Sequence, residues 1–190
     1  GRPFYGWYLV GITAFVLAVV ISPILQGIGT FFVALEDEFG WSRTLLAGAF
    51  SLARAEDTII GPLVGYLTDR VGARRLVLVG FVVLGAGFFL LGTIQSVVGF
   101  YAAFIVITAG AGFAGFLPLM GAINHWFIRY RTTAMGMAQA GVSIGGLLVP
   151  ALAWSITTFG WRNTSYGMGV LMLALAVPVS AAIRNRPEQY

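Results

Sequence analysis

The chain has 190 residues, of which 58% are hydrophobic and only 9% are charged. Soluble domains carry roughly 25% charged residues, so this composition excludes an ordinary water-soluble protein and predicts an all-α, polytopic membrane protein. The absence of cysteine excludes disulfides and thiolate metal sites. The net charge of +4 comes from arginines spaced between apolar stretches, which does not favour a nucleic-acid partner.

Six long apolar stretches predict six transmembrane helices joined by short connections. A stretch of about 18 or more apolar residues is long enough to cross the hydrocarbon core of a bilayer. The first stretch is too long for the apolar part of a signal peptide. In chain order the predicted helices cover 7–32, 43–69, 75–95, 98–124, 132–158 and 164–183, and together they form one bundle over residues 1–190.

Prolines and glycines are frequent within the predicted helices. A proline breaks a soluble helix, but neighbouring helices in a membrane bundle can pair the freed carbonyl groups. Small residues four positions apart, as at Gly61 and Gly65 or at Gly141 and Gly145, let two helices approach closely. We therefore expect closely packed helices with kinks at internal prolines, namely Pro23, Pro62, Pro118, Pro150 and Pro178.

The arginines predict the orientation of the bundle. Arg43 and Arg162 lie on one side of it, and Arg54 lies inside a helix. Cytoplasmic connections carry the excess of positive charge, so the other side, with eight arginines, is predicted to be cytoplasmic together with both ends of the chain. These eight are Arg2, Arg70, Arg74, Arg75, Arg129, Arg131, Arg184 and Arg186.

A short motif recurs at two outer connections. Residues 39–43 read Phe-Gly-Trp-Ser-Arg, and residues 159–163 read Phe-Gly-Trp-Arg-Asn. Two interpretations stay open: an ordinary belt of interfacial aromatic residues, or a trace of the three-plus-three helix repeat found in many transporters.

Three charged residues lie near the middle of the second predicted helix, close to the bilayer midplane: Arg54, Glu56 and Asp57. A charge at this depth costs roughly 2.5–3.5 kcal/mol on insertion scales, so it needs a partner, a proton or a water-filled cavity. Arg54 and Asp57 share a helix face and can neutralise each other. Glu56 points about 200° away from Arg54 and needs another partner. We interpret Arg54 as a candidate carboxylate-binding group and Glu56 as a candidate proton site; the alternative is a structural ion network.

Further polar residues are expected at membrane depth. Gln26 and Thr30 lie in the first predicted helix, and Gln139 and Ser143 lie in the fifth. Each is a candidate for substrate contact or, alternatively, for a hydrogen bond between helices. His125, the only histidine, is expected to be an interfacial anchor.

Two patterns typical of enzymes occur in misleading places. Residues 110–115 match G-x-G-x-x-G and residues 141–145 match G-x-S-x-G, but both lie inside apolar helices without the strand that each motif requires. We therefore predict no catalytic residues, no cofactor and no metal site.

The connection between the second and third predicted helices carries the most specific motif, G-Y-L-T-D-R-V-G-A-R-R over residues 65–75. Its first glycine permits a close helix contact, its second serves a tight turn, and its aspartate can pair with an arginine or cap a helix. The motif resembles the G-x-x-x-D-R-x-G-R-R loop of the major facilitator superfamily, with one residue inserted late in the pattern. The matching residues are Gly65, Asp69, Arg70, Gly72, Arg74 and Arg75.

Other stretches sharpen the resemblance. Residues 38–43, 126–131, 134–141 and 160–162 are similar to the bacterial monocarboxylate and oxalate/formate antiporter-like branch, so the resemblance covers nearly the whole chain. In this family two six-helix halves form the fold; helices one, two, four and five line the path, and three and six lie outside. The family resemblance implies that the 65–75 loop latches the halves together, whereas a loop that only sets topology is the alternative.

The resemblance implies a secondary transporter, not an enzyme, whose missing partner is a C-terminal six-helix half. Its implied substrate is a small organic anion such as a monocarboxylate, carried by proton symport or anion exchange across the bacterial inner membrane. A cavity arginine suits a carboxylate. Two other hypotheses remain: a non-transporting sensor or assembly protein on a six-helix scaffold, and a half-size transporter that acts as a dimer.

Overall fold

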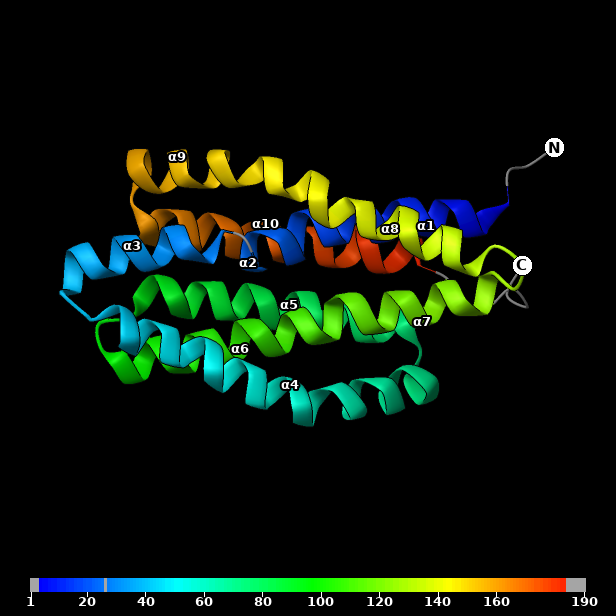
Figure 1. Cartoon of the computed structure of the whole chain (residues 1–190), viewed down its shortest axis with the longest axis horizontal. Coiled ribbons are helices and arrows are strands. Elements are labelled where there is room, and N and C mark those ends of the chain that lie inside the picture. Colours follow the sequence, from blue (N-terminus) through cyan, green and yellow to red (C-terminus); the bar gives the residue numbers. More distant parts are fainter. Residues whose placement is uncertain (1–3, 26, 184–190) are drawn as a thin grey trace.

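The computed structural model describes residues 4–25 and 27–183, and every regular element within these ranges is a helix. The predicted all-α class is therefore confirmed. The helices run along one long axis and connect at two opposite ends (Figure 1). In chain order they are α1 (Tyr5–Val16), the π-helical η1 (Leu17–Ile21), α2 (Ser22–Leu25), α3 (Ile28–Phe39), α4 (Arg43–Val71), α5 (Ala73–Thr93), α6 (Val97–Ala114), α7 (Phe116–Trp126), α8 (Arg131–Gly145), the 3-10 turn η2 (Gly146–Leu148), α9 (Val149–Phe159) and α10 (Trp161–Ala182).

We call each run of helices that crosses the bundle once a rod. The first rod is not one continuous helix but is divided into α1, η1, α2 and α3. Pro23 lies in the interrupted part, and its carbonyl oxygen accepts a hydrogen bond of 3.0 Å from the N–H of Gly27. The rod runs past the predicted end at residue 32 and ends at Phe39, where Gly40 adopts a left-handed φ of 70°.

Two other rods are interrupted close to prolines. α6 ends at Ala114, whose carbonyl would pair in a continuous helix with the N–H that Pro118 lacks. α8 passes into α9 through the tighter turn η2, just before Pro150. Pro62 and Pro178 lie inside α4 and α10, which continue through them. The prolines therefore mark a break in some helices and not in others.

Glycines show where α8 lies against the first rod. A β-carbon at Gly141 would lie 2.1 Å from the carbonyl oxygen of Ala14, and Gly145 approaches η1 and α2 as closely. The expectation of close packing at this pair is confirmed. A β-carbon at Gly61 or Gly65 would meet nothing within 4 Å, so the same expectation is wrong for α4 within the described residues.

The third rod, α5, forms the packed interior of the bundle with α6 and α10. Gly80 of α5 leaves no room for a side chain next to Ala114, and Gly85 lies as close to Leu173 of α10. Large side chains of α5 and α6, including Phe81 and Ile107, are fully buried. This packing fixes α6 against α5.

Five segments of the described residues are long and apolar enough to cross a membrane: Tyr5–Phe39, Ala73–Thr93, Val97–Trp126, Arg131–Phe159 and Trp161–Ala182. The second rod, α4, has 29 residues and a length of about 43 Å, which also suffices. Each 18-residue window of α4 includes Arg54, Glu56 and Asp57, and these charges lower its apolar character. The start of α1 and the end of α10 lie at the same end of the bundle (Figure 1).

Candidate functional site

A cavity of about 290 Å³ lies beside the middle of α4. Its walls also include residues of η1, α2, α6 and the first turn of α7. Among the described lining residues, polar side chains come from Arg54, Asp57 and Thr108, and most of the remaining wall is aliphatic or aromatic, including Phe50 and Phe104. An apolar cavity with a few polar groups is the usual composition of a small-molecule site.

The helical repeat of α4 places Arg54 and Asp57 on the cavity wall. The lining residues of α4 recur every three or four positions from Phe50 to Val64, which is one face of a helix. Arg54 and Asp57 make no ion pair within 4.0 Å with each other or with any other described residue, so the expected mutual neutralisation is absent from this structure. Both side chains are exposed, which leaves them accessible to water or to a ligand.

Glu56 turns away from this face toward α6. Its two carboxyl oxygens lie 3.3 and 3.4 Å from Oγ1 of Thr108, and Glu56 is half-buried. Thr108 in turn lines the cavity. Sequence reasoning missed Thr108, although a threonine within an apolar helix was a usable signal.

The structure separates the other predicted site residues from this cavity. Gln139 and Ser143 lie one turn apart on the exposed side of α8 and do not line the cavity. The hydroxyl of Thr30 donates to the carbonyl of Gly27 at 2.5 Å, a local bond at the start of α3. Gln26 lies outside the described residues.

The connection from α4 to α5 turns at a single residue, Gly72, with φ of 94° and ψ of 152°. Its N–H donates to the carbonyl of Thr68 at 3.1 Å. Asp69 is exposed, makes no ion pair with a described residue and does not cap α5. Arg70 lies 5.3 Å from the ring centroid of Tyr66, and the two arginines at the start of α5 are exposed. The loop is thus a tight, basic and exposed turn.

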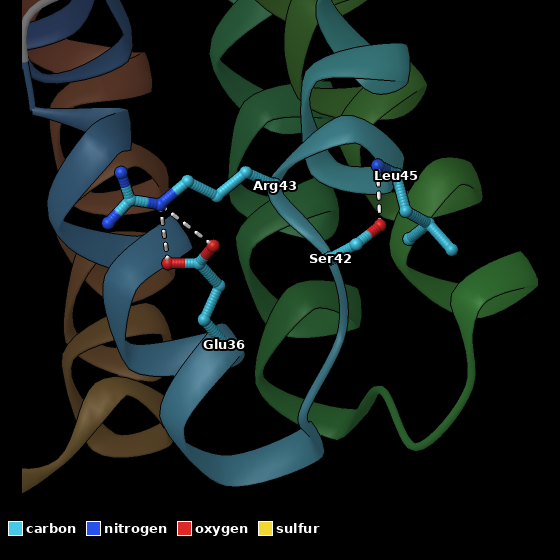
Figure 2. A network of polar contacts seen from close by, with 4 residues as sticks. All are labelled: Glu36, Ser42, Arg43 and Leu45. Atoms are coloured by element: carbon cyan, nitrogen blue, oxygen red, sulfur yellow. Dashed lines mark hydrogen bonds and ion pairs between the residues drawn. The ribbon is translucent and has the colours of Figure 1, made fainter.

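The opposite end of α4 is fixed by a polar network (Figure 2). Nε of Arg43 donates to Glu36 at 3.1 Å, which joins the end of α3 to the start of α4. Oγ of Ser42 accepts the N–H of Leu45 at 3.2 Å and caps α4. This cap explains why α4 begins at Arg43.

The two copies of the recurring motif meet at this same end. Gly40 and Gly160 both have positive φ, of 70° and 86°, and each follows the last residue of a helix. Phe39 lies 5.9 Å from the ring of Trp161, whose indole N–H donates to Glu38. The contact joins the first and last rods and fixes the end of the bundle opposite the 65–75 loop.

Comparison with known proteins identifies the family to which this chain belongs. The profile of the Major Facilitator Superfamily matches residues 5–190. The chain is 32% identical over 187 residues to monocarboxylate transporter 11 of Mus musculus, covering 97% of this chain and 41% of that protein. It is 28% identical over 175 residues to monocarboxylate transporter 14 of Mus musculus, covering 90% of this chain and 34% of that protein.

A third relative, from a fungus, is also a transporter. The chain is 32% identical over 170 residues to the MFS-type transporter pynF of Aspergillus niger, covering 87% of this chain and 39% of that protein. The chain thus spans about two fifths or less of the length of these relatives. The predicted resemblance is confirmed, and the relatives are transporters, not enzymes. The chain belongs to the Major Facilitator Superfamily of membrane transporters.

Proposed function

We propose that this chain forms the N-terminal six-helix part of a secondary transporter for a small organic anion, most simply a monocarboxylate. Transport proceeds by alternating access, as proton symport or anion exchange. The observation that carries the proposal is Arg54, a cation without an ion-pair partner among the described residues, on the wall of an apolar cavity.

The cavity favours a small anionic substrate. Its volume of about 290 Å³ is at the lower end of the range found for ligand pockets, roughly 300–1,000 Å³. A guanidinium group binds a carboxylate through two parallel hydrogen bonds, and aliphatic walls accept a short hydrocarbon chain. Asp57 lies on the same wall, and its negative charge disfavours substrates with a second negative charge.

The second part of the proposal concerns the C-terminal six-helix half. A β-carbon at Gly61 or Gly65 would meet nothing within 4 Å in the described chain, and Asp69 is exposed on the same helix. A surface of small residues suits close packing against another helix, so this side of α4 and the 65–75 loop would meet the second half and latch it. The arginine bias places this loop in the cytoplasm, for a protein of the bacterial inner membrane.

Uptake of labelled monocarboxylates of increasing chain length, with the matching alcohols as neutral controls, tests the substrate class. Arg54→Gln is expected to lose affinity for the anions while the protein still inserts and folds. Arg131→Gln, which removes an exposed arginine outside the cavity, is the matched control. Unchanged anion affinity in well-folded Arg54→Gln would contradict the assignment.

An exchange of Arg54 and Asp57 separates binding from a structural role. The exchange keeps both charges but moves the positive charge by three residues, about 4.5 Å along the helix. A purely structural pair should tolerate the exchange and keep transport. A binding arginine should lose substrate affinity in a protein that is otherwise intact.

A further inference from the structure

The hydroxyl group of Thr108 has more acceptors around it than protons to donate. Its Oγ1 lies 3.0 Å from the carbonyl oxygen of Phe104 and 3.1 Å from that of Ile105. The two carboxyl oxygens of Glu56 lie at 3.3 and 3.4 Å from the same atom. A threonine hydroxyl supplies one proton and accepts through its lone pairs. The two carbonyls already accept backbone N–H bonds within α6, so an ionised Glu56 would have to draw the single Thr108 proton away from them.

A proton on Glu56 resolves this mismatch. The carboxylic acid then donates to Oγ1 of Thr108, and the Thr108 hydroxyl donates to the nearer carbonyl, that of Phe104. Every group in this series of hydrogen bonds then has a partner, and no net charge lies between α4 and α6. An ionised carboxylate at this depth would need a cation, and none lies within 4.0 Å of Glu56 among the described residues.

The charges around Glu56 agree with this arrangement. α6 contains no Asp, Glu, Arg or His, and the nearest charged groups on α4 are Arg54 and Asp57 on the cavity face. The other helices that contact α4 carry their titratable groups near their ends. These end groups are Glu36, Asp37, Glu38, Arg74, Arg75 and His125.

We propose that Glu56 and Thr108 form the proton site of the transporter, with Thr108 as the positioning residue that holds the protonated carboxyl group. When Glu56 releases its proton to water in the cavity, the Thr108 hydroxyl rotates and donates to the carboxylate instead. Thr108 contacts Glu56 and also lines the cavity, so it connects the carboxyl group with the substrate space. This inference rests on the proposed function and commits it to proton symport.

The experiment combines infrared spectroscopy with uptake by the complete protein in lipid vesicles. The C=O band of a protonated carboxylic acid is expected in the wild type and absent in Glu56→Gln. Thr108→Val should move or remove this band, and Thr108→Ser should restore it. Thr157→Val is the matched control, because Thr157 donates to its own helix at the Ala153 carbonyl, 2.9 Å away, and does not line the cavity.

Uptake gives the second readout. The Thr108 hydroxyl accepts from the neutral acid but donates to the carboxylate, and a bond to the charged group is roughly twice as strong, so its loss should favour proton binding. Thr108→Val should then reach half-maximal uptake at a higher external pH than the wild type, while Glu56→Gln should lose the pH dependence. Thr108→Ser and Thr157→Val should behave as wild type.

The outcomes separate this inference from the proposed function. If Glu56→Gln changes neither the infrared band nor the pH dependence, Glu56 is ionised and the inference is overturned, even where uptake still depends on Arg54. If the protein takes up none of the anions but Thr108→Val still shifts a Glu56 band, the proton site stands and the substrate assignment fails.

Discussion

Replacing Gly141 with alanine tests the packing that holds the bundle together. The new β-carbon would lie 2.1 Å from the carbonyl oxygen of Ala14 and 2.7 Å from its Cα, and backbone atoms of α1 cannot rotate away. α8 would have to shift from the first rod. Overpacking of this kind typically costs about 1–3 kcal/mol of unfolding free energy.

Gly136→Ala is the matched control on the same helix. A β-carbon at Gly136 would meet nothing within 4 Å. Both substitutions remove a glycine from the interior of α8, so the gain in helix propensity, up to about 1 kcal/mol, is common to both and cancels in their difference. The difference between the variants therefore isolates the steric cost.

Thermal unfolding of the complete protein in detergent or vesicles, monitored by helical circular dichroism, measures this difference. Gly141→Ala is expected to unfold at a clearly lower temperature than Gly136→Ala. Equal unfolding temperatures for the two variants would show that α8 does not lie against α1 as closely as the structure places it.

Three further predictions concern the two ends of the bundle. The chain has no cysteine, so Ile128→Cys should resist an impermeant thiol reagent added from outside and Asp37→Cys should react with it; the reverse pattern would refute the orientation. Asp69→Asn should impair turnover more than expression, and a normal turnover rate would argue against a latch. Trp161→Phe removes the donor to Glu38 and should cost about 1–3 kcal/mol in thermal unfolding, so an unchanged melting temperature would show that this bond adds nothing.

The apolar pattern predicted the helical class well, but it placed the end of the first helix too early. Hydropathy falls at Glu36, Asp37 and Glu38, whereas the backbone stays helical until Gly40 allows the chain to turn. A helix can continue into the polar interface, so loss of apolar character and end of helix are separate events. The prolines show the same limit, because Pro118 follows a break and Pro62 does not.

The candidate site was predictable only where one helix determines it. The depth and spacing of Arg54 and Asp57 follow from the sequence of α4, and the structure places both on one cavity. The partner of Glu56 is 52 residues away in the sequence, at Thr108. Which residue of α6 meets Glu56 depends on the rotation and offset of two packed helices, and no local pattern encodes these quantities.

The separation of the three charges around α4 has a consequence for coupling. Arg54 and Asp57 face the cavity, while Glu56 faces α6, so one helix can present an anion site and a proton site to different surroundings. On the proposed assignments, an ionised Glu56 adds a negative charge within one helical turn of the bound carboxylate, in a region of low dielectric constant where such repulsion is strong. Protonation of Glu56 removes that repulsion and strengthens anion binding at Arg54. By linkage, the bound anion strengthens proton binding by the same factor, so the two species load together without any contact between them.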